Sequence, residues 1–402
     1  MTISERFLKY VSFDTQSDED SNTIPSTLKQ LEFAKYLLFE LKQLNIDAHL
    51  NEYGIVYAKI KANNNSKKTI GLIAHMDTAT DLTGKDVNPR IIYNYDGSDI
   101  VLNSELNIIM SPDSFVSLKD NINKDLIVTD GTTLLGGDDK AGIAIIMDFV
   151  EYVVKHPEYK HCNIAIAFTP DEEIGKGADN FDVKYFNADF AYTIDGGPIN
   201  EISYENFNAA SAKVIVNGNS IHPGSAKNKM INSILVANEF NLLLPQDAIP
   251  SKTEGYEGFN HLCDIQGNCE KTIMDYIIRN HDAKLLEKQK QDFCNAAKII
   301  NKKYQPNTIE LIIKDSYKNM KELILQKPIV LETVFNAFKK LNIEYKLDPI
   351  RGGTDGARLT YDGLPTPNLG TGGYNCHGKY EYVVVQQMET MVNIIKEIFN
   401  AS

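Results

Sequence analysis

The stretch IGLIAHMD at residues 70–77 decides the fold class. It begins with a continuous apolar run, Ile70 to Ala74, of the kind that lies buried in the middle of a sheet covered by helices. It ends in His75 and Asp77, whose burial costs several kcal/mol unless they are paired or bind a metal. A buried strand that ends in an imidazole and a carboxylate predicts an α/β protein with a polar site at the carboxyl end of its sheet.

Patterns of helix and strand alternate around this stretch. Apolar residues spaced three and four apart predict amphipathic helices, and short apolar runs predict buried strands. The predicted helices cover about residues 3–13, 28–44, 140–156, 230–244, 283–303, 329–341 and 384–399. The predicted strands cover residues 55–60, 70–74, 163–168, 190–194, 211–216 and 309–314. This alternation favours the α/β class.

The length of 402 residues exceeds one ordinary domain, so two domains are expected. After Asp195 the pattern changes to a half-exposed alternating strand followed by new helices, which is typical of an inserted α+β domain. We predict a discontinuous first domain of residues 1–206 and 319–402, with a second domain of residues 207–318 inserted into it.

Composition excludes several classes of partner and compartment. The 54 acidic and 41 basic residues give a net charge of −13, and no basic run with interleaved aromatics could follow a phosphate backbone, so we expect no nucleic acid. No apolar run approaches the ~18–20 residues of a membrane span, and the first residues lack a signal-peptide pattern, so we expect no membrane. Five cysteines without a Cys-x-x-Cys pair favour a reducing compartment, and we expect a cytoplasmic protein.

His75 and Asp77 are two residues apart at a strand end, so their side chains share a face. Asp77 can accept a hydrogen bond from the imidazole edge that does not bind a metal, which would orient His75 as a ligand. Taken alone, this short and common pattern favours the alternative, a buried histidine paired with an aspartate for structural reasons.

Asp138 lies in a glycine-rich turn that leads into a helix. Glycine lets the backbone bend sharply there, and a carboxylate at the turn could reach two separate cations, which makes Asp138 a candidate bridging ligand. The alternative is a helix N-cap, since Asp138 and Asp139 both precede the helix and aspartate is a good cap. Asp139 could be the cap while Asp138 binds metal.

Glu172 and Glu173 follow a buried apolar strand and Pro170. Adjacent side chains diverge on a turning backbone, so one glutamate could bind metal while the other faces the substrate as a general base. Paired glutamates are often only a solvated surface, but the preceding buried strand weakens that alternative.

Asp195 ends a strand before two glycines, and His377 lies in a glycine-flanked loop much later in the chain. Either residue alone could be an ordinary turn residue. Together the candidates supply two histidines and three carboxylates, a mixed nitrogen and oxygen set that suits zinc, with cobalt or manganese as substitutes.

These segments, in this order, resemble the di-zinc metallopeptidases that include glutamate carboxypeptidases and amino-acylases. The shared motifs are HxD at 75–77, GDDKAG at 137–142, the glutamate pair at 172–173, Asp195 and His377. The resemblance is strongest to the members that act as tripeptide aminopeptidases, and it covers essentially the whole chain. It rests on residues 130–136, 169–175, 195–197, 221–224, 253–259, 276–279, 350–356 and 372–378.

The resemblance implies a mixed central sheet flanked by helices, with a site for two Zn²⁺ ions per subunit and an inserted lid. One zinc would be held by His75 and Asp195, and the second by Glu173 and His377. Asp138 would bridge the two ions. Two further residues would be catalytic: Glu172 as the general base and Asp77 as the orienting carboxylate.

The resemblance also implies three substrate-binding residues. His222 would come from the lid to stabilise an oxyanion, and Arg279 and Arg351 would hold the C-terminal carboxylate of a peptide. Surface salt bridges are the alternative for the arginines. A carboxylate clamp at a fixed distance from the metals would explain a preference for tripeptides.

Two residues depart from the pattern of the family. Gly137 stands where alanine is expected before the bridging aspartate, and Cys376 stands where an apolar residue is expected before the metal histidine. Neither departure removes a ligand, so they bear only on local rigidity and sensitivity to oxidation.

The resemblance thus implies a zinc-dependent aminopeptidase that removes the N-terminal residue from unblocked tripeptides. A dipeptidase or N-acyl amino-acid deacylase on the same scaffold would share every metal ligand. A non-catalytic peptide-binding relative is the third reading, although such proteins typically lose a ligand or the base. The expected partners are small peptides, and the protein could be a monomer or a homodimer.

Overall fold

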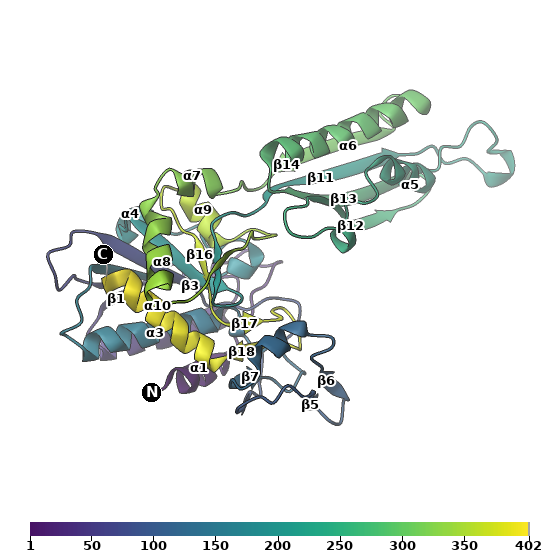
Figure 1. The fold of residues 1–402 in the computed structure, drawn as a ribbon. Helices are drawn as coiled ribbons and strands as arrows, with labels where there is room; N and C mark the ends of the chain where they lie inside the picture. The colour runs from purple at the N-terminus through teal and green to yellow at the C-terminus, as the bar shows by residue number, and fades with distance from the viewer. Residues whose placement is uncertain (401–402) are drawn as a thin grey trace. The chain divides into compact units, whose positions relative to one another are not determined.

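The computed structural model describes residues 1–400, which form two compact units (Figure 1). The first unit contains Met1–Tyr204, Glu322–Asp348 and the chain from Thr354 onward. The second contains Glu205–Lys321 and Pro349–Gly353. The chain therefore leaves the first unit, builds the second, and returns to complete the first.

An eight-stranded sheet forms the centre of the first unit, in the order β1-β2-β8-β3-β9-β16-β10-β15. The run predicted to be buried forms β3 (Thr69–His75), which lies parallel to and between β8 (Asn163–Thr169) and β9 (Phe190–Gly196). Antiparallel pairs, such as β2 with β8, make the sheet mixed. The remaining strands are β1 (Asp47–Leu50), β2 (Val56–Ile60), β10 (Glu201–Ser203), β15 (Lys346–Leu347) and β16 (Asn368–Gly370).

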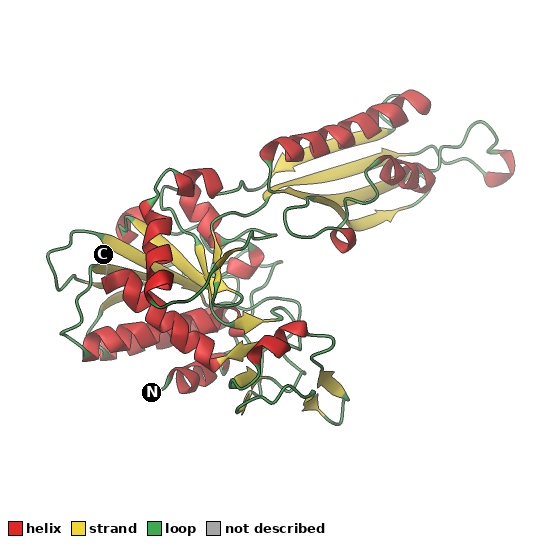
Figure 2. Ribbon diagram, in the orientation of Figure 1, coloured by secondary structure: helices red, strands yellow, loops and turns green. Residues whose placement is uncertain are grey.

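Helices flank this sheet, as Figure 2 shows in red. The long helix α3 packs along β3 and β9 and against α1 and α10, and most of its residues are buried. On another face, Ile73 of β3 packs with Phe186 of α4 and Leu359 of α9. The helices are α1 (Ile3–Val11), α2 (Leu28–Gln43), α3 (Gly137–Lys155), α4 (Val183–Phe186), α7 (Lys321–Leu325), α8 (Ile329–Lys340), α9 (Asp355–Tyr361) and α10 (Val385–Asn400). The predicted class, a mixed central sheet flanked by helices, is confirmed.

A small sheet, β17-β18-β7-β4, connects two segments of the site. β18 (Tyr382–Val384) pairs with β7 (Leu126–Val128), which precedes the glycine-rich turn, and with β17 (Gly373–Tyr374), which precedes His377. The sheet thus brings the loop that carries His377 beside the turn that carries Asp138. The other strands of this region are β4 (Arg90–Ile92), β5 (Ile100–Asn103) and β6 (Ile108–Met110).

The second unit is an antiparallel sheet in the order β12-β13-β11-β14, with a core that includes residues of α5 and α6. Alternating residues of β11 and β13, including Val214, Met274 and Ile278, point into this core and are fully buried. Its elements are β11 (Asn208–Asn217), α5 (Ser233–Leu243), β12 (Phe259–Gly267), β13 (Lys271–Asn280), α6 (Ala283–Lys303) and β14 (Ile309–Asp315).

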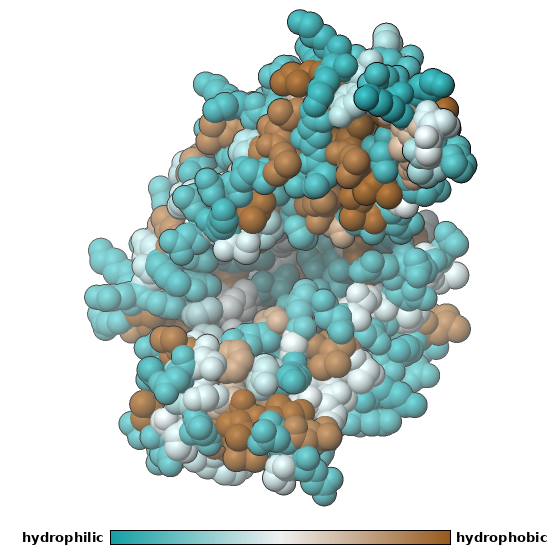
Figure 3. Space-filling view, turned by 90° about the vertical axis from the view of Figure 1, so that its right-hand side faces the viewer, coloured by the Kyte–Doolittle hydropathy of each residue, from teal (hydrophilic) through white to brown (hydrophobic). Residues whose placement is uncertain are grey.

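Figure 3 shows hydrophilic residues over much of the face that it draws, with smaller hydrophobic patches between them. Some large apolar side chains, such as Leu28 and Tyr93, are exposed, as is normal for a protein surface. Within residues 1–400, none of the helices combines the length and the apolar character needed to cross a lipid bilayer.

Candidate metal centre

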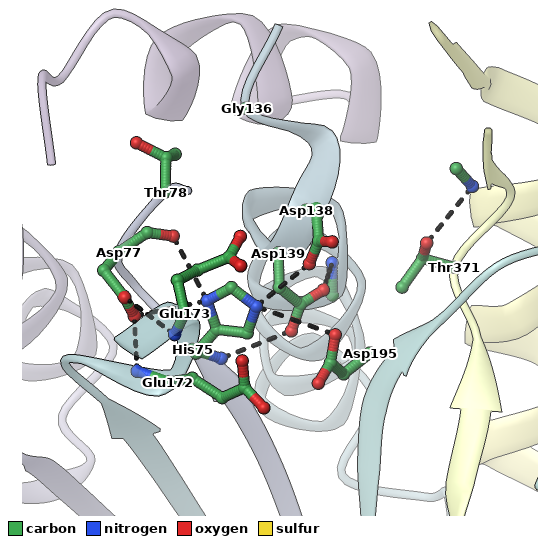
Figure 4. Close-up of polar contacts among 12 residues, drawn as sticks. His75, Asp77, Thr78, Gly136, Asp138, Asp139, Glu172, Glu173, Asp195 and Thr371 are labelled. Carbon is green, nitrogen blue, oxygen red and sulfur yellow. Dashed lines mark hydrogen bonds and ion pairs between the residues drawn. The ribbon is translucent and has the colours of Figure 1, made fainter. Parts of the chain in front are cut away.

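His75 is the centre of a buried polar cluster at the carboxyl end of β3 (Figure 4). Its side chain is 2% exposed, and its Nε2 atom lies 2.9 Å from Asp138 Oδ1 and 3.6 Å from Asp195 Oδ1. Its other ring nitrogen, Nδ1, lies 3.1 Å from the backbone oxygen of Asp77 and 3.3 Å from Asp77 Oδ1. A proton on Nδ1, held by Asp77, leaves the Nε2 lone pair free for a metal.

Asp77 does more than face His75. Its fully buried carboxylate also accepts the backbone N–H groups of Glu172 (3.0 Å) and Glu173 (3.1 Å), and the hydroxyl of Ser17 (2.5 Å). One carboxylate therefore fixes the orientation of the histidine and of the turn that carries both glutamates.

Asp138 lies between the two candidate histidines. Its Oδ1 atom faces His75, and its Oδ2 atom lies 3.5 Å from His377 Nε2. The turn before it bends at Gly136, which has the left-handed φ of 80° that glycine adopts without strain. The peptide bond that joins Asp138 to Asp139 is cis.

Asp139 points elsewhere. Its Oδ1 atom accepts the backbone N–H of Gly142 (3.1 Å), as a helix N-cap does, and its Oδ2 atom accepts the backbone N–H of His75 (3.2 Å). The carboxylate is 1% exposed, and burial raises its pKa well above the usual value.

The glutamate pair lies on the short helical turn Glu172–Ile174 that follows β8. Glu173 Oε2 lies 3.0 Å from His377 Nε2, while its Oε1 atom is buried without a hydrogen-bond partner among the described residues. Burial raises the pKa of Glu173 to about 7. For Glu172, burial and then the charge of Asp195 raise the pKa well above its usual range.

Asp195 and His377 complete the cluster from segments far apart in the chain. Asp195 is the penultimate residue of β9, and burial raises its pKa to about 6. His377 is about half exposed, and its Nδ1 atom lies 3.4 Å from Asp81 Oδ2. Hydrogen bonds to Asp138 and Glu173 raise the pKa of His377 to about 11.

The electrostatics of this cluster fit a bound cation. Burial opposes a charge on His75, but Asp195, Asp138 and Asp77 outweigh it and hold its pKa well above the usual value. Two sets of three side chains could each hold a metal ion, because the ligand atoms within each set lie within 4.8 Å of one another. One set is His75, Asp138 and Glu173, and the other is His75, Asp139 and Asp195. The unpartnered Glu173 Oε1 atom and the mixed imidazole and carboxylate donors suit a metal such as zinc.

The structure adds acidic residues that sequence reasoning did not assign to the site. Asp355, at the start of α9, is 7% exposed and accepts a hydrogen bond from Thr169 Oγ1 (3.2 Å). Burial raises its pKa to about 7. Asp81 faces His377, and Glu381 contacts the turn of Asp138. Asp355 belongs to the segment 350–356, on which the family resemblance partly rests. The sequence around Asp81 and Glu381 contains no pattern from which their place in the site could be predicted.

The three predicted substrate-binding residues belong to the second unit. His222 is exposed, and its Nδ1 atom accepts the backbone N–H of Gly224 (3.2 Å). Arg279, on β13, donates to the backbone oxygens of Ala210 (3.2 Å) and Ile278 (3.1 Å), and its guanidinium lies 5.3 Å from the ring centre of Tyr317.

Arg351 already has many partners within the second unit. It donates to the backbone oxygens of Gly255 (2.7 Å) and Glu257 (2.9 Å) and to Thr253 Oγ1 (3.0 Å). Its guanidinium also lies 5.7 Å from the ring centre of Phe259, the residue paired with Arg279 across β12 and β13. The two arginines therefore lie near the same aromatic residue. Among the described residues, no acidic side chain forms a salt bridge with either of them.

Comparison with known proteins identifies relatives over nearly the whole chain. Peptidase family M20/M25/M40 matches residues 131–401. Peptidase T of Caldanaerobacter subterraneus subsp. tengcongensis is 54% identical over 398 residues, which cover 98% of this chain and 97% of that protein. Peptidase T of Clostridium acetobutylicum is 53% identical over 398 residues, which cover 98% of each chain.

Solved structures show the same fold. Aminopeptidase PepT from Bacillus cereus ATCC 10987 superimposes with a TM-score of 0.78 at 21% identity, over 99% of this chain and 97% of that chain. A tripeptidase from Staphylococcus aureus gives a TM-score of 0.78 at 20% identity, over 99% and 97%. A dinuclear metal binding peptidase of Bacillus subtilis gives 0.63 at 12% identity, over 98% and 96%.

These comparisons confirm the resemblance to which the sequence motifs pointed. The match is long enough to include every candidate site residue, from His75 to His377. This chain therefore belongs to Peptidase family M20/M25/M40, with the Peptidase T proteins as full-length relatives.

Proposed function

We propose that this chain is a zinc-dependent aminopeptidase that removes the N-terminal residue from unblocked tripeptides. The family and the Peptidase T relatives support a peptide hydrolase, and the aminopeptidase and tripeptidase of the same fold support the choice of substrate. The observation that carries the proposal is the position of Asp138, whose two oxygens face His75 and His377 separately.

The donor set fits two zinc ions. His75 and Asp195 would hold one, Glu173 and His377 the other, and Asp138 would bridge them. Cobalt or manganese, which accept similar ligands, are possible substitutes. When bound, the metals would polarise the peptide carbonyl and lower the pKa of water.

Glu172 is the proposed general base. Its backbone N–H donates to Asp77 Oδ1 (3.0 Å), and burial and the charge of Asp195 raise its pKa well above the usual range, which makes its ionised form a stronger base. Such a carboxylate can take a proton from water and deliver it to the leaving amine. Asp77 would serve as the orienting carboxylate, since it contacts both His75 and the backbone of Glu172.

The second unit, corresponding to the predicted segment 207–318, would act as a lid that brings substrate-binding groups. His222 would stabilise the developing oxyanion. Arg279 has a guanidinium without an acidic partner among the described residues, and it would bind the C-terminal carboxylate of the peptide. Arg351 would share that role while it holds the loop 253–257 in place.

We further propose a cytoplasmic location. All five cysteines are free thiols, which fits a reducing compartment. Small peptides are the proposed partners, and both a monomer and a homodimer are compatible with the proposal.

The test is release of the N-terminal residue from a free tripeptide, compared with the matching dipeptide, tetrapeptide and N-acetylated tripeptide. Each reaction is run on chelator-treated protein with and without added zinc. We expect selective cleavage of the free tripeptide that zinc restores. Cleavage of the dipeptide or the acetylated peptide would instead indicate a dipeptidase or a deacylase on the same metal site. Zinc binding without any cleavage would overturn the proposal in favour of a binding role.

A further inference from the structure

Glu381 is a buried carboxylate that contacts the turn of Asp138 and has no role in the proposed chemistry. Glu381 directly precedes β18 and is 1% exposed. Its Oε2 atom accepts the backbone N–H groups of Leu135 (2.8 Å) and Gly136 (2.9 Å). Its Oε1 atom accepts the backbone N–H of Asp138 (3.0 Å).

We infer that Glu381 is a positioning residue for the metal centre, which holds the backbone of Asp138 so that its carboxylate lies between His75 and His377. The inference rests on the metal centre proposed above. Hydrogen bonds that a carboxylate accepts are roughly twice as strong as neutral ones, and Glu381 makes three to one short turn. Among the described residues, no other side chain accepts a hydrogen bond from these three N–H groups.

The position of Glu381 is itself well fixed. The next residue, Tyr382, pairs with Val128 in the β18–β7 ladder, so the backbone beside Glu381 belongs to the same small sheet that leads into the turn. The backbone N–H of Glu381 also donates to the oxygen of Gly378 (3.1 Å), the residue after His377. Glu381 therefore joins two segments that carry proposed ligands, one with Asp138 and one with His377.

The turn is packed so closely at Gly137 that there is no space for a side chain there. A Cβ atom on Gly137 would lie 2.6 Å from Val383 Cγ2 and 2.9 Å from Glu381 Oε1. An alanine side chain at this position would push against the carboxylate of Glu381 or against the buried side chain of Val383. Glycine at residue 137 thus lets the turn approach Glu381 closely enough for all three hydrogen bonds.

The charge of Glu381 also argues for a role beyond simple hydrogen bonding. The carboxylate lies close to the carboxylate of Asp138, and the two repel each other when both are ionised. The buried ammonium of Lys140, which donates to the backbone oxygen of Phe13 (2.9 Å), offsets part of this charge. The three backbone N–H groups that donate to Glu381 also favour its ionised form.

The decisive variant is Glu381→Gln. The glutamine amide has one accepting oxygen, so it can accept hydrogen bonds either from Leu135 and Gly136 or from Asp138. Its NH₂ group would then face an N–H donor on the other side, with which it cannot form a hydrogen bond. The variant keeps the size of the side chain and most of its packing. We expect zinc affinity to fall by about 10- to 100-fold, as for other groups that orient metal ligands.

Zinc affinity is measured by competition with a chelator, and the visible spectrum of the cobalt-substituted protein reports ligand geometry. The matched control is Asp189→Asn, because Asp189 accepts the backbone N–H of Thr69 (2.9 Å) at the other end of β3 from His75. The control should bind zinc like the wild type, with an unchanged cobalt spectrum. A Glu381→Gln protein with wild-type affinity and an unchanged spectrum would overturn the inference.

A second measurement needs no variant. In the metal-free wild type, the amides of Leu135, Gly136 and Asp138 should exchange with deuterium slowly, because Glu381 holds them without help from a metal. Fast exchange of these amides would overturn the inference even if the variant failed to fold. Absence of zinc binding in the wild type would instead overturn the metal centre on which the inference rests.

Discussion

At the scale of single residues, adjacent side chains of one turn have different surroundings. The backbone N–H groups of Glu172 and Glu173 both donate to Asp77. Their side chains differ, because one carboxylate oxygen of Glu173 faces His377. This divergence follows from the turn that begins at Asp171, whose φ is 61°. Two identical residues can therefore take a metal-binding and a proton-transfer role.

Replacing the proposed base tests this division. Glu172→Gln keeps the size of the side chain but removes its ability to accept a proton, so turnover of a tripeptide should fall by about 10²- to 10⁴-fold. Zinc content, measured by elemental analysis, should stay at the wild-type value because the ligands are unchanged. Glu52→Gln, at an exposed position, is the control and should retain full activity. Near-normal turnover in Glu172→Gln would refute the assigned role.

The buried carboxylates also predict how metal stabilisation depends on pH. Burial raises the pKa of Glu173 to about 7 and that of Asp195 to about 6, whereas the pKa of a carboxyl group in an unfolded chain is about 4. Between these values the folded metal-free protein holds more protons than the unfolded chain, so its stability falls as pH rises from about 4 to about 7. The raised pKa of His377 acts in the same direction up to about pH 11.

Zinc bound at the proposed site would replace these protons, so the stabilisation that it provides should grow with pH. Thermal unfolding of stripped and zinc-loaded protein at pH 5, 6 and 7 would measure the difference between the two midpoints. We expect that difference to increase with each step. A difference that stays constant across this range would show that the ligands bind no extra protons in the metal-free fold.

Local patterns in the sequence predicted some parts of this centre and missed others. His75, Glu173 and Asp195 follow apolar strands, so their clustering could be expected from the rule that strand ends meet at one edge of a sheet. Asp81 and Glu381 could not be found in this way. Their surroundings arise from contacts between segments far apart in the chain, and neither residue terminates a periodic element.

At the scale of secondary-structure elements, strong periodicity made most helices predictable. The predicted helix at 283–303 has the bounds of α6, and the predicted strand at 163–168 ends one residue before β8 does. The hairpin of β12 and β13 was missed. Ile273 and Ile277 lie on the face of β13 opposite its buried residues, so apolar residues occur on both faces and the alternation is unclear. The strands of the β17-β18-β7-β4 sheet are too short to show any period.

The packing of the first helices depends on a buried arginine. Arg6 of α1 is 2% exposed and pairs with Glu40 of α2 (2.7 Å) and with Glu151 of α3. Tyr10 also donates to Glu40 (2.7 Å), so the network joins three helices. Removal of Arg6 leaves the carboxylates of Glu40 and Glu151, which are 15% and 16% exposed, without the buried cation that joins them.

Arg6→Met should therefore lower the free energy of unfolding by about 3–5 kcal/mol. Methionine preserves the packing of the side-chain stem, so the loss reports the charge network. Denaturant unfolding measures it, with Lys119→Met as the control, because Lys119 pairs with Asp113 on the surface and should contribute little. An equal effect of the two substitutions would argue against a special role for the buried network.

At the scale of the whole molecule, the proposed ligands all belong to the first unit, whereas the proposed substrate-binding residues belong to the second. A metal stabilises the part of the protein that binds it, by about 2.7 kcal/mol at a concentration 100 times its Kd. Zinc alone should therefore slow hydrogen exchange in β3, β8 and β9 and leave β11, β13 and α6 unchanged. Magnesium at the same concentration is the control. Equal slowing in both units would show that zinc acts beyond the first unit.

The order of the segments along the chain also bears on how the enzyme is made. The chain leaves the ribosome from its N-terminus, so His75, Asp138, Glu173 and Asp195 emerge before the second unit is synthesised. His377 and Glu381 emerge only after it. During translation the proposed metal centre is thus incomplete, and it can be assembled only after the whole inserted unit and the segment that carries these last residues have been made.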